Sequence, residues 1–159
     1  MVFQIPTLEG AESFEPNWLL SPQSLCGKKG ASVPGSVGPL GLLVMASGDM
    51  RKHTDVFFTV FRQNHKYKVL MCTDLSKSSS RDGMYKPPYG AFADMDIEAQ
   101  GGSISLRTLV DQSVVESYGD GGRTCITARV YPDHVVNGNN HLYVFNNGTG
   151  VVKVSSLNA

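Results

Sequence analysis

The chain has 159 residues, of which 41% are hydrophobic and 18% charged, a composition that suits one globular domain and excludes a disordered chain. Its 14 basic and 14 acidic residues cancel, so we expect neither nucleic acid nor an anionic membrane as a partner. The apolar stretches are far shorter than the roughly 20 residues that cross a bilayer, and the N-terminus lacks the basic and apolar regions of a signal peptide. We expect no membrane span and no signal peptide in this chain.

Short segments rich in Val, Ile, Phe, Tyr and Thr recur along the chain between clusters of Gly, Asn, Asp, Ser and Pro, a pattern typical of an all-β fold. Two regions interrupt it, residues 15–38 and 76–89, and their Ser, Pro and Gly content predicts long surface loops without an amphipathic helix. The predicted strands cover residues 2–5, 41–46, 56–62, 66–73, 91–97, 103–111, 114–118, 124–131, 141–146 and 151–157.

The side-chain pattern within these strands predicts how they pack. Residues 103–110 alternate with an imperfect period of two, which turns one face of the strand inward. Residues 57–61 and 142–145 are apolar on both faces, as expected of central strands or of strands that face a partner domain. The Gly-Asp-Gly-Gly sequence at residues 119–122 predicts a hairpin turn. We predict one all-β domain over residues 1–159, an antiparallel two-sheet β-sandwich of jelly-roll-like type.

Acidic residues on the predicted strands are candidates for a glycosidase site, because retaining glycosidases use two carboxyl groups about 5 Å apart. Asp94 and Asp96 lie on one face of the predicted strand 91–97, whose alternate residues Ala93, Met95 and Ile97 take the core face. Since acids are seldom buried, we interpret Asp94 and Asp96 as a solvated strand edge.

A second acidic pair lies near three arginines. Asp111 and Glu116 flank residues 113–115, and Arg107, Arg123 and Arg129 lie on neighbouring predicted strands. Opposite charges on adjacent strands stabilise a sheet when their side chains face one another. We therefore predict a cross-strand ion-pair cluster here rather than a catalytic site.

The histidines and cysteines show no spacing typical of metal or nucleophile sites. The four histidines are interpreted as surface or turn residues: His53, His65, His134 and His141. The three cysteines allow one bridge and one free thiol, and we expect no metal and no cofactor. Asn147 begins an Asn-Gly-Thr sequon at the end of a predicted strand, where a glycan could project into solvent.

Several segments are more specific than generic β sequence. They are residues 38–44 (GPLGLLV), 69–74 (VLMCTD), 103–111 (SISLRTLVD), 111–119 (DQSVVESYG), 122–132 (GRTCITARVYP) and 144–149 (VFNNGT). In order and spacing they resemble plant acid invertases. Over nearly its whole length the chain is similar to family 32 glycoside hydrolases, a family of plant cell-wall and vacuolar invertases, fructan exohydrolases and fructosyltransferases. The resemblance implies a C-terminal β-sandwich.

The resemblance also implies that the catalytic groups lie elsewhere. Family members carry an N-terminal five-bladed β-propeller with aspartates in Asn-Asp-Pro-type and Arg-Asp-Pro motifs and an acid/base glutamate in Glu-Cys. None of these motifs occurs in this chain, and the nearest approach, Arg81-Asp82-Gly83, lacks the proline. No catalytic residue is therefore assigned. The family tends to join two cysteines that match Cys26 and Cys72, which would leave Cys125 free.

The leading hypothesis is a structural, accessory C-terminal domain of a β-fructofuranosidase, a cell-wall-type invertase that as an intact retaining enzyme hydrolyses sucrose or fructans. Its expected partner is the propeller in cis, with sucrose or fructan at the cleft between the domains, and the isolated chain is expected to be inactive. The alternatives are a carbohydrate-binding module that uses the loop aromatics Trp18, Tyr85 and Tyr89, and a truncated regulatory homologue that docks on a separate propeller. The parent enzyme is expected in the apoplast, cell wall or vacuole, and this chain, without a signal peptide, resembles a truncated form.

Overall fold

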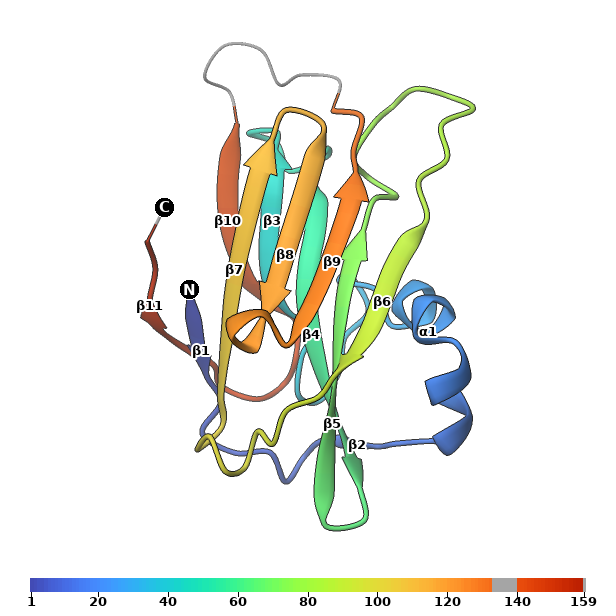
Figure 1. Ribbon diagram of the computed structural model, residues 1–159. Helices are drawn as coiled ribbons and strands as arrows, with labels where there is room; N and C mark the ends of the chain where they lie inside the picture. Colours follow the sequence, from blue (N-terminus) through green and yellow to red (C-terminus); the bar gives the residue numbers. More distant parts are fainter. Residues whose placement is uncertain (133–139, 159) are drawn as a thin grey trace.

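The computed structural model describes residues 1–132 and 140–158. Within them the chain folds into two antiparallel sheets that pack face to face (Figure 1), which confirms the predicted all-β, two-sheet sandwich. The elements in chain order are β1 (Val2–Gln4), β2 (Glu12–Ser13), η1 (Pro16–Leu20), α1 (Pro22–Lys28), β3 (Leu40–Ala46), β4 (Thr54–Gln63), β5 (Lys66–Asp74), β6 (Pro88–Ala93), β7 (Ser103–Asp111), β8 (Val114–Gly119), η2 (Asp120–Gly122), β9 (Thr124–Arg129), β10 (His141–Asn146) and β11 (Lys153–Ser156).

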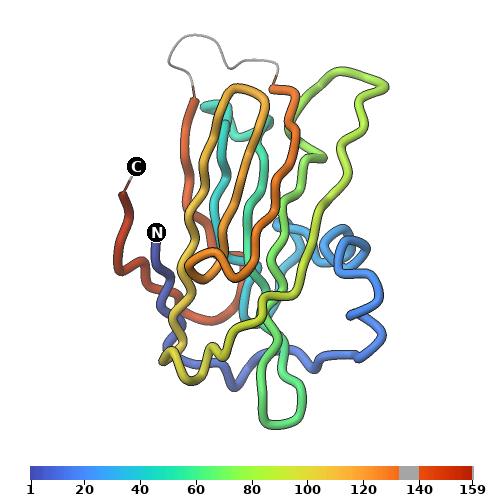
Figure 2. The backbone as a smooth tube through the Cα atoms, in the orientation of Figure 1, coloured from blue at the N-terminus to red at the C-terminus, as the bar shows by residue number. Residues whose placement is uncertain are grey.

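The strand order brings the two ends of the sequence together. One sheet has the order β11-β1-β7-β8-β9, and the other has the order β10-β3-β4-β5-β6, with the short β2 paired in parallel with β4. On one long side of the sandwich β9 lies close to β5 and β6. On the other long side the sheets end at β10 and at the β1–β11 pair, as the tube in Figure 2 shows.

Most predicted strands agree with the observed ones to within a residue or two, the usual uncertainty of strand ends. The exception is the strand predicted at residues 91–97, which forms at Pro88–Ala93 instead. Proline lacks a backbone N–H and is tolerated on an edge strand, and β6 is the edge of its sheet. After Ala93 the chain leaves the sheet but still alternates, with Met95 and Ile97 buried.

The prediction of a continuous loop over residues 15–38 is wrong, because the segment contains η1 and the seven-residue helix α1. Pro22 stands at the start of α1, where its fixed φ and missing N–H are favourable. A helix this short is marginal alone and depends on tertiary packing, which Leu25 and Cys26 provide by burial. None of the described helices is long and apolar enough to span a membrane.

Strand β4 is buried on both faces, as its apolar sequence predicts. Its inward residues, among them Val56 and Phe58, belong to the main core between the sheets. Its outward residues Phe57 and Phe61 pack in a second cluster with Phe14, Leu25, Cys26, Leu70 and Cys72. The second face of this central strand is therefore covered by the chain's own N-terminal segment rather than by another domain.

A disulfide joins α1 to the sheet. Cys26 of α1 and Cys72 of β5 are bonded, with their Cα atoms 5.8 Å apart, and Cys125 on β9 is a free, exposed cysteine. Helix and sheet approach so closely here that a Cβ atom placed on Gly90 of β6 would clash with Cys26 Sγ. Glycine at position 90 thus permits the close packing of α1 that brings the two sulfur atoms together.

Candidate functional site

Asp94 and Asp96 lie just beyond β6, and both are exposed while Ala93, Met95 and Ile97 are buried. This confirms the prediction that the two acids are exposed to solvent, although the strand ends before them. The backbone N–H of Ala99 donates to Asp96 Oδ1 at 3.1 Å, so this carboxylate is part of a turn. The two acids border a hollow of about 610 Å³, together with the basic residues Lys66, Lys68 and Arg123.

The predicted ion-pair cluster around Asp111 and Glu116 does not form. In the β7–β8–β9 register Asp111 lies opposite Val114, and Glu116 lies opposite Thr127. The hydroxyl groups of Thr127 and Tyr118 both donate to Glu116, at 3.3 and 3.4 Å. The charge of Glu116 raises the pKa of Tyr118 above its ordinary value of 10.0, because ionisation would place two negative charges side by side.

The arginines of that predicted cluster pack on aromatic rings or pair within a turn. The guanidinium groups of Arg107 and Arg129 lie 5.9 and 5.6 Å from the ring centres of Tyr118 and Tyr131. Planar guanidinium groups interact favourably with ring faces at such distances. The outer face of β7, β8 and β9 is therefore a surface of hydroxyl, aromatic and arginine groups, without a catalytic carboxyl pair.

The predicted hairpin turn at residues 119–122 is present between β8 and β9. Asp120, Gly121 and Gly122 all have positive φ, at 49°, 68° and 98°. Arg123 Nε lies 3.4 Å from Asp120 Oδ2, and Gln100 Nε2 donates to the same oxygen at 3.0 Å. Asp120 thus ties the turn to the segment before β7.

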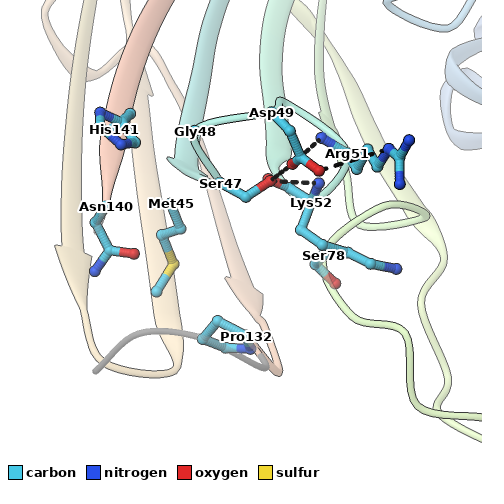
Figure 3. Close-up of a pocket in the computed structure, with 10 residues that line it drawn as sticks. All are labelled: Met45, Ser47, Gly48, Asp49, Arg51, Lys52, Ser78, Pro132, Asn140 and His141. Atoms are coloured by element: carbon cyan, nitrogen blue, oxygen red, sulfur yellow. Dashed lines mark hydrogen bonds and ion pairs between the residues drawn. The ribbon is translucent and has the colours of Figure 1, made fainter. Parts of the chain in front are cut away.

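A hollow of about 550 Å³ lies at the turn between β3 and β4 (Figure 3). Asp49 is the one carboxylate among the described residues that line it. Asp49 Oδ1 accepts two hydrogen bonds, one from Ser47 Oγ at 2.6 Å and one from the backbone N–H of Arg51 at 3.1 Å. These hydrogen bonds lower the pKa of Asp49 below its usual 3.8, and that from Ser47 has the larger effect. The hydrogen bonds shape the turn, and the hollow lacks the second carboxyl group that glycoside hydrolysis requires.

Histidine 53 is buried, contrary to the expectation of a surface or turn residue. His53 Nδ1 lies 2.8 Å from the Met50 carbonyl oxygen, and His53 Nε2 lies 3.1 Å from Asp55 Oδ1, with both side chains less than a tenth exposed. Such an enclosed pair cannot reach a substrate and serves the fold. His65 and His141 are exposed, and His134 lies outside the described residues. Residues 1–132 and 140–158 contain no cluster of three or more metal-binding side chains.

The three aromatic residues proposed to stack on sugars have different surroundings. Trp18 lies in η1, and its ring packs against Phe14 and Phe61 with centroids 5.7 and 5.0 Å away. Tyr89 lies in β6 and packs against the main core. Tyr85 is 77% exposed in the loop before β6. A carbohydrate-binding platform of these three rings is therefore not favoured by the structure.

The sequon residue Asn147 follows β10 and is half-buried. Its side-chain nitrogen, the atom to which a glycan would attach, donates to the Ala31 carbonyl oxygen at 3.2 Å. The backbone N–H of Asn147 donates to Pro39 O at 2.8 Å, and the Gly35 N–H donates to Asn147 O at 3.3 Å. Asn147 thus holds the turn after β10 against residues 31–39, and its glycosylation stays a prediction.

A further hollow, which the sequence pattern did not predict, lies between β7 and β10. It has a volume of about 660 Å³ and a mainly apolar lining that includes Met1, Leu42, Val110 and Leu142. Of the two alternatives for residues 142–145, the central strand covered on both faces is wrong, because β10 is an edge strand with Leu142 and Val144 exposed, and a strand that faces a partner domain stays a prediction. The sequence shows that these residues are apolar but not that the strand lies at an edge.

Comparison with known proteins gives consistent matches over the whole chain. Residues 16–159 match the family described as "Glycosyl hydrolases family 32 C terminal". The chain is 69% identical over 158 residues to the fructan 6-exohydrolase of Triticum aestivum and 66% identical over 160 residues to the β-fructofuranosidase, insoluble isoenzyme 7, of Oryza sativa subsp. indica. These alignments cover 99% and 100% of this chain but only 26% and 27% of the relatives, so the chain spans about a quarter of their length.

The fold has a close counterpart among solved structures. The crystal structure of fructan 1-exohydrolase IIa from Cichorium intybus superposes on this chain with a TM-score of 0.89 and 47% sequence identity. The superposition covers 98% of this chain and 28% of the other. The two-sheet sandwich is thus one part of that larger protein.

Proposed function

Because this chain belongs to the C-terminal domain family of the family 32 glycosyl hydrolases, we propose that it acts as a non-catalytic accessory domain of a β-fructofuranosidase or fructan exohydrolase. Its substrate-hydrolysing partner is the part of such an enzyme that lies outside this chain. The names of the similar proteins support this assignment, since they are fructan exohydrolases and a β-fructofuranosidase. The expected substrates of the complete enzyme are sucrose or fructans.

The placement of the carboxylates carries the proposal. A retaining glycosidase needs two carboxyl groups about 5 Å apart at a cleft. Here Asp94 and Asp96 are exposed beyond β6, Glu116 is bonded by two hydroxyl groups, and Asp49 is part of a turn. None of these four carboxyl groups is buried in an apolar pocket of the kind that holds the general acid of a glycosidase.

We further propose that the protein matures in an oxidising compartment, the apoplast, cell wall or vacuole. The buried disulfide between Cys26 and Cys72 supports this, since such bonds are rare in the reducing cytosol. The sequon at Asn147 agrees with it, because N-glycans are added in the secretory pathway.

The test of the proposed function is the release of fructose. The purified chain is incubated with sucrose and with a short fructan, beside a mock-purified control, and we expect no fructose above the control. The variants Asp94→Asn and Glu116→Gln are assayed in parallel. Release that survives repurification and disappears in either variant would show that the chain carries its own active site, and the proposal would be wrong.

A further inference from the structure

Both ring nitrogens of the buried His53 face oxygen atoms. Nδ1 lies 2.8 Å from the carbonyl oxygen of Met50, and Nε2 lies 3.1 Å from Asp55 Oδ1. A carbonyl oxygen only accepts hydrogen bonds, and so does an ionised carboxylate. A neutral imidazole carries one N–H and one lone pair, so it would turn its lone pair toward one of these two oxygens. An imidazolium has an N–H for each of them.

The carboxylate of Asp55 lies where a negative charge needs a partner. Asp55 is 3% exposed, and its Oδ1 has no hydrogen bond from the residues that the structure describes. The β4–β5 register places Asp74 directly opposite Asp55, and like charges at opposite positions of a sheet destabilise it. Burial of a charged group is costly unless an opposite charge lies beside it. A cation on the His53 ring would supply that charge.

We propose that His53 is held as an imidazolium in the folded domain, and that this proton makes the sandwich more stable in mildly acidic than in neutral solution. In an unfolded chain an imidazole takes up its second proton near a pH of about 6.5. The folded domain keeps the proton to higher pH, because the Met50 carbonyl and the Asp55 carboxylate both attract the cation. Its stabilising effect is therefore fully present below a pH of about 6.5 and is lost as the pH rises until folded His53 releases the proton.

The charges around the pair favour the imidazolium. Asp74 adds a second carboxylate on the face of the sheet that carries Asp55. The side chain of Arg51 is 85% exposed and lies 3.5 Å from Asp49, so its positive charge is screened. Strand β3 presents the uncharged Leu43 opposite Asp55. The other described charged or titratable residues of the surrounding turn, loop and strand are Lys52 and Lys86, which are half-buried, and the exposed Lys77, Arg81, Asp82 and His141.

The proton also connects the turn between β3 and β4 to the body of the sheet. Met50, whose carbonyl faces His53, has a φ of 55°, which is uncommon for a residue with a side chain. The backbone N–H of His53 donates to the Lys77 carbonyl oxygen at 3.1 Å, so His53 joins this turn to the loop after β5. Residues of the same turn, among them Asp49 and Arg51, line the hollow shown in Figure 3. Loss of the proton should therefore loosen this turn before the rest of the domain.

The direct test is the imidazole nitrogen spectrum of the unmodified whole chain, labelled with ¹⁵N. At a pH of about 7.5, above the usual titration of imidazole, we expect both ring nitrogens of His53 to carry a proton. The variant His53→Gln assigns the signals, and His65→Gln, His134→Gln and His141→Gln assign the other rings if that variant does not fold. A spectrum in which His53 Nε2 has no proton would overturn the inference, because the carboxylate would then face a lone pair.

The second test compares stability at two pH values. The unfolding equilibrium constant is measured in urea at a pH of about 6 and of about 8 for the parent chain and for Asp55→Asn, which removes the charge and nearly keeps the shape. Between the two pH values the constant of the parent should rise about tenfold more than that of Asp55→Asn, the ratio that corresponds to one pH unit of proton retention. The matched control His65→Gln changes an exposed histidine and should rise as the parent does.

Equal rises in the parent and in Asp55→Asn would also overturn the inference. The proposal rests on the described contacts of His53 and not on the proposed function. Neither test involves the release of fructose, so a failure here is distinguishable from a failure of the accessory role.

Discussion

Removal of the disulfide should cost the domain a large part of its stability. The bond between Cys26 and Cys72 closes a loop with a sequence separation of 46, for which chain entropy gives about 4 kcal/mol. Domains have total stabilities of about 5–15 kcal/mol, so the double variant Cys26→Ala, Cys72→Ala should remain folded only narrowly. Both side chains are fully buried beside Phe57 and Leu70, so lost packing adds to the entropic loss.

The assay is equilibrium unfolding in urea, followed by the fluorescence of Trp18, which packs on the same cluster. With a slope of about 2 kcal/mol per molar urea, the double variant should unfold at a midpoint about 2 M lower than the parent. The matched control is Cys125→Ala, which removes an exposed thiol and should leave the midpoint unchanged. Equal midpoints for the parent and the double variant would refute the reasoning.

Three further predictions concern single side chains. His53→Ala should destabilise the domain by about 1–3 kcal/mol in urea unfolding, because it leaves buried polar atoms of Met50 and Asp55 without the imidazole beside them, and an unchanged midpoint would contradict this. Glu116→Gln should lower the pKa of Tyr118 towards 10.0 in an ultraviolet titration of tyrosinate, since the repelling charge is removed, and an unchanged pKa would contradict the assignment. When the chain is secreted from a plant cell behind an added signal peptide, it should lose mass on treatment with an N-glycosidase, with the glycan on the Asn147 peptide, and an unmodified peptide would argue against its glycosylation.

Local sequence pattern was sufficient for most of the sandwich. The alternation of residues 103–110 and the apolar, aromatic-rich run at residues 142–145 predict β7 and β10 at their observed bounds, 103–111 and 141–146. Helix α1 was not predictable in the same way. Of its seven residues only Leu25 and Cys26 are buried, which is too few for an amphipathic pattern. The helix is stabilised by its packing on β5 and β6 and by its disulfide to Cys72.

Features that depend on strand register or position were beyond the sequence pattern. The ion-pair prediction for Glu116 failed because the register places Thr127 opposite it, and a shift of one residue changes every cross-strand neighbour. The sequence also could not distinguish a central strand from an edge strand of equal hydrophobicity. Phe57 is buried because β4 is a central strand, and Leu142 is exposed because β10 is an edge strand. The groove beside β7 could therefore be found only in the structure.

The central claim, that this chain supports catalysis without performing it, is tested most directly in a chimera. The C-terminal segment of the Triticum aestivum fructan 6-exohydrolase that aligns with this chain is replaced by this chain, and kcat/KM is measured for a fructan and for sucrose. The account predicts an active enzyme whose ratio of the two kcat/KM values matches that of the unmodified exohydrolase within about threefold. A folded chimera whose preference shifts to a different substrate, or whose activity is abolished by Glu116→Gln in this chain, would contradict it.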